Sequence, residues 1–144
     1  NQSTFSGTFT LIQSASTGQI KGLLNANGLV PLTRHAIHIH SFGDTSQFDT
    51  QIGPHFNPTN TSHGCPSSTS TTAFHLGDIG SFDVDSTGSV VNKAWTLTPN
   101  NISLINLNSP GFVLGRSIAI HEKEDDCTSQ PAGNSGAKIA VGVV

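Results

Sequence analysis

The sequence has little charge, little sulfur and no long apolar run. Among 144 residues it has six Lys and Arg and nine Asp and Glu, and Met and Tyr are absent. The resulting net charge of −3 argues against nucleic acid and anionic membranes as partners. No apolar run is long enough to predict a membrane span. The first residues lack the charged and apolar regions of a secretory signal, so a signal was either removed or never present.

Small polar residues are abundant instead, namely Ser, Thr, Asn and Gly. This composition is typical of an extracellular β protein, and the length predicts one domain over residues 1–144. Sequons at Asn1, Asn60 and Asn101 favour secretion and glycosylation, although such triplets also arise by chance in this composition. Outside the cell, Cys65 and Cys127 are expected to form a disulfide, with two free thiols as the alternative.

Alternation of apolar and polar residues is common, whereas helical periodicity is nearly absent. We expect strands near residues 5–11, 20–24, 34–40, 82–85, 90–95, 102–107, 112–121 and 138–144. Asn27-Gly28 and Ser86-Thr87-Gly88 predict hairpins. Eight short strands separated by turns predict an all-β sandwich or barrel.

Two long segments interrupt this regularity. The first runs from Ser41 to about Ser81, and the second runs from Glu122 to Ala137. Structureless segments of this length are usually functional or disordered. The first one is rich in histidine, and metal ligands would order it.

Six of the seven histidines could assemble a two-metal site. They are His38, His40, His55, His63, His75 and His121, and Asp78 accompanies them in the first long segment. In a strand, His38 and His40 share one face while Ile37 and Ile39 face the core. Alone, this pair favours two exposed surface histidines over a metal site. The joint pattern favours metal, because imidazoles with a carboxylate suit copper and zinc.

Several segments together resemble the copper/zinc superoxide dismutase family. They are His38 to Asp44 (HIHSFGD), Gly53 to Pro58 (GPHFNP), His63-Gly64, His75 to Gly80 (HLGDIG), Gly115-Arg116 through His121-Glu122-Lys123, and Gly133 to Lys138 (GNSGAK). The matches run in the family's order along nearly the whole chain. The resemblance implies an eight-stranded Greek-key β-barrel or sandwich with two long functional loops.

The resemblance also implies a role for each residue. The copper ligands would be His38, His40, His55 and His121. The zinc ligands would be His55, His63, His75 and Asp78. His55 would then bridge the two metals. Asp125 would hydrogen-bond one histidine of each site, with membership of a plain acidic run as the alternative.

The implied reaction is dismutation of superoxide to oxygen and hydrogen peroxide. Copper would cycle between two oxidation states, and zinc would stay redox-silent. His55 would be catalytic, because it would take up a proton when its link to copper opens and return it later.

Three features depart from the family pattern. Lys138 stands where the family usually has an arginine beside the copper channel; we expect it to attract anions there, with a solvated surface cation as the alternative. The segment after Asp125 is shorter than the family's electrostatic loop, so we expect a slower, less salt-sensitive enzyme or a more open copper. The family's disulfide positions are Asp49 and Val141 here, so a Cys65–Cys127 bridge would instead join the two long loops.

Three functions remain open from the sequence. The first is a secreted copper/zinc superoxide dismutase with reduced activity, and the second is a non-enzymatic copper- and zinc-binding body-fluid protein on the same scaffold. A glycosylated module with empty sites is the third. The complete ligand set favours the enzyme, whereas Lys138 and the short loop favour the carrier. Family dimer-contact residues are retained at Phe42-Gly43-Asp44 and Gly115, which leaves a homodimer open.

Overall fold

A computed structural model describes residues 5–48, 50–66, 73–97 and 101–144. Across these residues the regular secondary structure consists of β-strands. The described residues contain no helix that is long and apolar enough to cross a membrane. The strands are β1 (Ser6–Gln13), β2 (Ile20–Asn27), β3 (Arg34–His40), β4 (Asp78–Asp83), β5 (Val90–Thr96), β6 (Ser117–His121) and β7 (Lys138–Val143).

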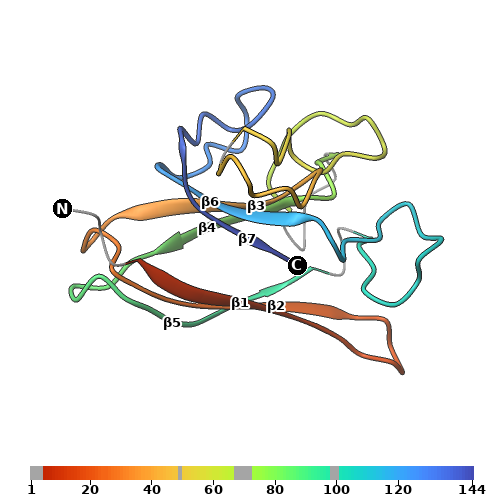
Figure 1. Cartoon of the computed structure of the whole chain (residues 1–144), viewed down its shortest axis with the longest axis horizontal. Helices are drawn as coiled ribbons and strands as arrows, with labels where there is room; N and C mark the ends of the chain where they lie inside the picture. The colour runs from red at the N-terminus through yellow and green to blue at the C-terminus, as the bar shows by residue number, and fades with distance from the viewer. Residues whose placement is uncertain (1–4, 49, 67–72, 98–100) are drawn as a thin grey trace.

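The strands form two antiparallel sheets that face each other (Figure 1). One sheet has the order β1-β2-β5, and the other has the order β4-β3-β6-β7. Strands that are neighbours in space, such as β3 and β6, are far apart in the sequence, as Greek-key connections require. The predicted all-β sandwich is therefore confirmed.

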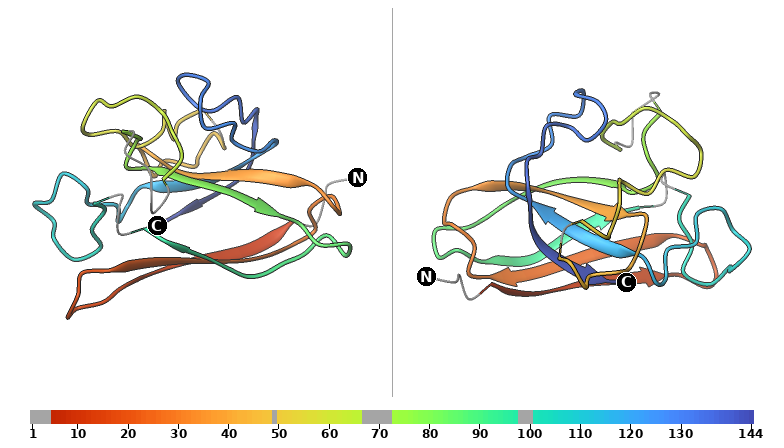
Figure 2. Two further views of the ribbon diagram at one scale, coloured as in Figure 1. Left: turned by 180° about the vertical axis from the view of Figure 1, so that it is seen from behind. Right: turned by 45° about the horizontal axis from the view of Figure 1, so that its top comes forward.

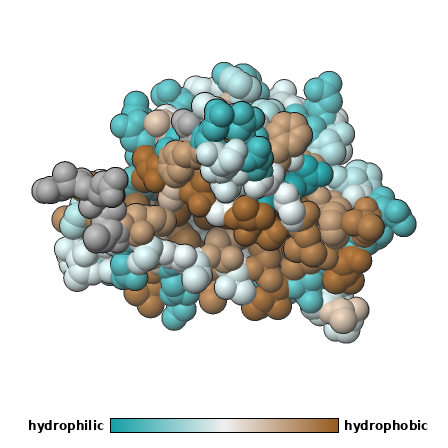
Figure 3. Space-filling view, in the orientation of Figure 1, coloured by the Kyte–Doolittle hydropathy of each residue, from teal (hydrophilic) through white to brown (hydrophobic). Residues whose placement is uncertain are grey.

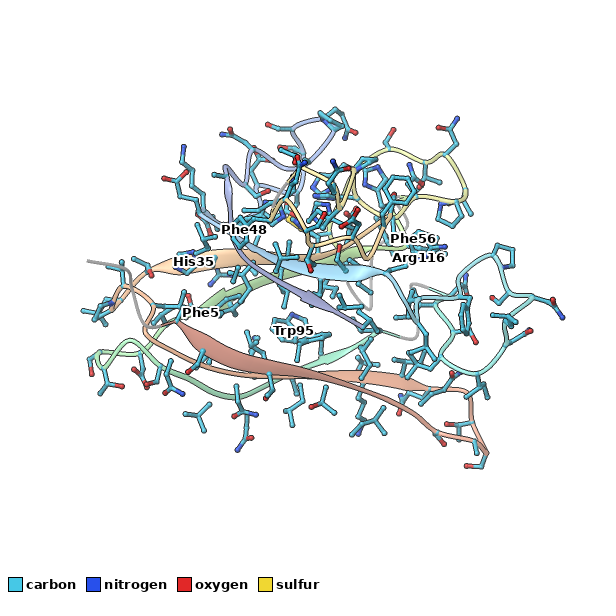
Figure 4. All side chains as sticks on the ribbon, in the orientation of Figure 1. Phe5, His35, Phe48, Phe56, Trp95 and Arg116 are labelled. Atoms are coloured by element: carbon cyan, nitrogen blue, oxygen red, sulfur yellow. A yellow bond between two sulfur atoms is a disulfide. The ribbon has the colours of Figure 1, made fainter. Side chains whose placement is uncertain are left out.

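One hydrophobic core fills the space between the sheets. Ile37 and Ile39 of β3 are 1% and 0% exposed and belong to this core. Trp95 of β5 points into the same space (Figure 4) and packs against Phe82, with ring centroids 6.3 Å apart. Burial of Ile37 and Ile39 fixes the rotation of β3, so alternate residues of that strand face outward.

The predicted strand at residues 102–107 is wrong, which leaves seven strands among the described residues. Only an isolated bridge between Ser103 and Phe112 occurs there. Asn106 explains the difference, because its backbone N–H donates to Ser103 Oγ while its side chain accepts from Asn108 N. Such local side-chain hydrogen bonds compete with a strand ladder. The predicted strand at residues 112–121 likewise begins only at Ser117.

Both predicted hairpins are also wrong. The turn after Asn27 leads from β2 to β3, and the turn around Gly88 leads from β4 to β5. In each case the two strands belong to different sheets. The turn residues therefore predicted correctly where the chain reverses direction. They could not show whether the next strand joins the same sheet or crosses to the other one.

The two long loops lie together on the outer face of the four-stranded sheet (Figures 1 and 2). The first ends at Gly77 rather than near Ser81, because β4 begins at Asp78. The second matches its predicted bounds, between His121 of β6 and Lys138 of β7. Figure 3 shows mostly hydrophilic residues over the loops, with hydrophobic residues gathered at the level of the sheets. The loops therefore cover the outward face of β3.

Candidate metal centre

Six histidines and one aspartate lie buried beneath the two loops. They form two groups, in each of which the candidate ligand atoms lie within 4.8 Å of one another. We call the first the four-histidine cluster, which consists of His38, His40, His55 and His121. We call the second the mixed cluster, which consists of His55, His63, His75 and Asp78. These are the two ligand sets that the sequence predicted.

The four-histidine cluster is built on the rigid strands. His38 and His40 lie on β3 and are 0% and 2% exposed, and His121 ends the neighbouring strand β6. An isolated bridge to His40 holds His55 against the same strand. The Nε2 atoms of His40 and His121 lie 3.3 Å apart, and the ring centroids of His38 and His55 lie 4.0 Å apart.

The mixed cluster converges on one carboxylate. Asp78 is 0% exposed at the start of β4. Its oxygens lie 2.9 Å from His55 Nδ1, 3.1 Å from His63 Nδ1 and 3.4 Å from His75 Nδ1. The backbone N–H groups of His75 and Gly64 donate to Asp78 Oδ2 at 2.9 Å and 3.2 Å. Three imidazole nitrogens and a carboxylate are thus gathered at one point.

His55 belongs to both clusters. Its Nδ1 faces Asp78, whereas its buried Nε2 has no hydrogen-bond partner among the described residues. The Nδ1 atom of His38 is likewise buried without such a partner in the described part of the chain. A buried polar atom without a partner is costly, and coordination to a metal would satisfy both nitrogens.

Asp125 links the two clusters from the second loop. Its Oδ2 accepts from His38 Nε2 at 2.7 Å, and its Oδ1 accepts from His63 Nε2 at 2.9 Å. Asp125 is itself fixed, because its backbone N–H donates to Ser81 Oγ and its Oδ1 accepts from Cys127 N. The carboxylate therefore orients one ring of each cluster.

Other ring nitrogens are bound by backbone carbonyls that the sequence did not reveal. His40 Nδ1 donates to Gly53 O at 2.8 Å, and His121 Nδ1 lies 3.4 Å from Gly136 O. The seventh histidine, His35, donates from Nδ1 to the backbone oxygen of His121 at 2.8 Å. Because His35 lies two residues before Ile37 in β3, the alternation of the strand indicates that His35 is buried. Nothing in the sequence indicates that it binds the backbone of His121.

Burial keeps three histidines of the four-histidine cluster neutral, namely His38, His40 and His121. Burial lowers the pKa of His38 to about 4, His121 to about 3 and His40 to about 2. Neighbouring histidines lower these pKa values further, since a second positive ring nearby is unfavourable. Neutral imidazole is the form that binds metals, so these three rings are ready for a cation at neutral pH.

The two carboxylates keep their negative charge despite burial. Burial alone raises their pKa values, but hydrogen bonds from His55 and His63 to Asp78, and from His38 and His63 to Asp125, hold both pKa values well below the usual range. For His63, burial lowers the pKa, but Asp125 and Asp78 outweigh it and raise the pKa to about 9. His63 therefore carries a proton at neutral pH, and a bound divalent cation would take the place of that positive charge between the two carboxylates.

The predicted disulfide is confirmed. Cys65 and Cys127 are bonded, with their Cα atoms 5.0 Å apart. Cys65 follows His63 by two residues, and Cys127 follows Asp125 by two. The bridge therefore joins the loops beside the His63–Asp125 hydrogen bond.

An open cavity of about 700 Å³ leads to the clusters. The cavity is lined by four histidines, by residues of the second loop and by Lys138; the histidines are His40, His55, His75 and His121. Lys138 is half-buried at the start of β7. Both clusters therefore contribute rings to the cavity lining, whereas His38 and His63 are not among the residues that line it.

Two of the three predicted glycosylation sites lie on the surface. Asn60 and Asn101 are exposed, whereas Asn1 lies outside the described residues.

The donor sets fit the metals that the sequence predicted. Three imidazoles and a carboxylate suit a closed zinc site, and four imidazoles suit copper. An all-β sandwich with two such clusters joined through one ring is the structure of a two-metal protein. The profile of the copper/zinc superoxide dismutase family matches residues 5–144. The chain therefore belongs to the copper/zinc superoxide dismutase family.

Known relatives agree with this assignment. A curated Cu-Zn superoxide dismutase from Botryotinia fuckeliana is 33% identical, and the match covers 99% of this chain and 90% of that protein. The one from Schizosaccharomyces pombe is 34% identical, over 96% and 88%. The crystal structure of the clock protein EA4 has a TM-score of 0.81 and 29% identity, over 99% of this chain and 88% of that one. A double mutant of a superoxide dismutase-like protein from Bacillus subtilis has a TM-score of 0.78 and 30% identity, over 94% and 85%.

Proposed function

We propose that this protein is a secreted superoxide dismutase in which the four-histidine cluster binds copper and the mixed cluster binds zinc. One observation carries the proposal: the two nitrogens of His55 face different clusters, and its buried Nε2 has no hydrogen-bond partner among the described residues. When bound, copper supplies one-electron redox chemistry, and zinc supplies a fixed positive charge.

The chain's own residues handle the anion and the proton. Two superoxide anions and two protons give oxygen and hydrogen peroxide. Lys138 on the cavity wall attracts the anion toward His40 and His55. His55 Nε2 is the atom placed to hold one of the protons, since Asp78 fixes the opposite side of the ring.

We expect the reaction to be slower than in relatives with a longer second loop. The chain has only six Lys and Arg with which to create positive potential. Lys138 offers a point charge rather than the planar fork of an arginine, so it attracts an anion without orienting it as well.

Secretion is supported by the disulfide and by the exposure of Asn60 and Asn101. Exposure of Phe42, at 58%, and Leu114, at 47%, supports a homodimer through the region that the sequence singled out.

The test is metal content and superoxide consumption measured on the same sample. We expect one copper and one zinc per chain and consumption that depends on copper. Stoichiometric metal without consumption would instead select the non-enzymatic copper- and zinc-binding protein. Absence of both would select the structural module.

A further inference from the structure

The side chain of Gln130 pairs with the backbone of His63 across the two loops. Gln130 Oε1 accepts from the backbone N–H of His63 at 2.8 Å, and Gln130 Nε2 donates to the backbone oxygen of His63 at 3.0 Å. The amide thus holds both backbone polar groups of one residue, as a neighbouring strand does.

His63 has few other means of fixing its backbone. It is 4% exposed, and the described residues 57–66 around it contain no strand. Buried backbone groups require partners, and in this stretch a side chain from the other loop provides them. The ring of His63 is held by Asp125 and faces Asp78, so backbone and ring are both fixed by tertiary contacts.

The segment that carries Gln130 is itself rigidly built. We call residues 125–133 the clamp segment. Its turn is held by Asp126, whose carboxylate accepts from Ser129 N and Ser129 Oγ at 2.8 Å and 2.6 Å. The segment closes on itself, because Gly133 N donates to Ser129 O at 2.8 Å and Asp126 N donates to Gly133 O at 3.0 Å.

The clamp segment also packs closely against the ring of His63, with no room for a side chain at Gly133. Gly133 has a φ of 66°, and a Cβ there would collide with Asp125 Oδ1 and lie 2.6 Å from His63 Nε2. The Cys65–Cys127 disulfide holds the segment at its other side. One short segment of the second loop therefore fixes His63 in three ways. Asp125 binds its ring, Gln130 binds its backbone, and the disulfide at Cys127 holds the neighbouring Cys65.

We propose that Gln130 is a positioning residue for the mixed cluster, and that the shortened second loop serves as a clamp on His63. The clamp holds His63 Nδ1 toward Asp78 before a metal arrives, which lowers the ordering cost of binding. This inference rests on the proposed assignment of the mixed cluster as a zinc site. It gives the short loop a role other than anion steering.

The test compares Gln130→Ala with Gln13→Ala. Gln13 is a matched control, because its Oε1 also accepts from a loop backbone N–H, that of Leu104 at 2.8 Å. Zinc affinity is measured on the disulfide-bonded protein by competition with a chromophoric chelator, and cobalt provides a visible spectrum at the same site. We expect Gln130→Ala to lower zinc affinity about tenfold or more and to change the cobalt spectrum, while Gln13→Ala leaves both unchanged.

A second variant separates positioning from general destabilisation. Gln130→Glu keeps the acceptor for His63 N but loses the donor to His63 O, so we expect an intermediate loss of affinity. Unchanged zinc affinity in Gln130→Ala and Gln130→Glu would overturn the inference, as would equal losses in Gln130→Ala and Gln13→Ala. A wild-type protein that binds no zinc would overturn it together with the zinc assignment. Tight zinc binding that depends on Gln130, without superoxide consumption, would uphold the clamp and refute only the proposed activity.

Discussion

Asp125 accepts a hydrogen bond of 2.7 Å from His38 although the two residues are 87 positions apart in the sequence. The same carboxylate accepts from His63 at 2.9 Å. One acidic group thus orients a ring in each cluster, and loss of its charge should affect both metals at once.

Asp125→Asn tests this link. An amide can accept from one of the two rings but presents its NH₂ group to the other, so one ring loses its partner. We expect copper and zinc affinities to fall about tenfold to a hundredfold, measured by chelator competition. Asp83→Asn is the control, because Asp83 is exposed and pairs with Arg34 instead. Equal affinities in wild type and Asp125→Asn would refute the role of Asp125.

The Cys65–Cys127 disulfide closes a loop with a sequence separation of 62. Removing both cysteines as Cys65→Ser with Cys127→Ser should lower the free energy of unfolding by up to about 4 kcal/mol, because the unfolded chain gains freedom. Urea unfolding of the metal-free protein measures this loss. We also expect weaker zinc binding, since the bridge ends two residues from His63. A chemically reduced wild type that retains full stability and zinc affinity would argue against both effects.

Among the described residues, Lys138 is the lysine that lines the cavity. Lys138→Glu reverses its charge, so we expect superoxide consumption at low ionic strength to slow about tenfold, with a smaller difference at high salt. Lys93→Glu makes the same change on β5, and we expect little effect there. If both variants slow the reaction equally, net charge rather than Lys138 governs anion attraction.

The stability of the metal-free protein should be greatest near pH 6.5. The lowered pKa values of His38, His40 and His121 mean that below pH 6.5 the unfolded chain binds more protons, so stability falls as pH falls. His63, with its pKa raised to about 9, stabilises fully below pH 6.5, and this contribution is lost as pH rises through 9.

Each group contributes a slope of at most about 1.4 kcal/mol per pH unit, so the acid side should be steeper. Urea unfolding across pH 4.5 to 9.5 provides the measurement. A stability that stays constant over that range would contradict the burial of these histidines.

Much of the site could be predicted because it rests on short-range regularities. Alternation in β3 placed Ile37 and Ile39 in the core and therefore His38 and His40 on the opposite face. The remaining ligands came from motifs that resemble a known family, and the structure brings those residues together.

The rest depends on contacts between distant segments. The alternation at residues 102–107 looked like a strand, but Asn106 and Ser103 bind the backbone locally. The pair between Gln130 and His63 joins residues 67 positions apart, and a glutamine before a proline carries no sign of such a partner. Period and propensity describe neighbours in the chain, so they cannot show where two loops meet.

The most direct test of the account is anomalous diffraction at the copper and zinc absorption edges from crystals of the metal-loaded protein. The account predicts a copper ion at His55 Nε2 among the four-histidine cluster and a zinc ion at His55 Nδ1 beside Asp78. An imidazole of His55 that contacts only one ion, or neither, would contradict it.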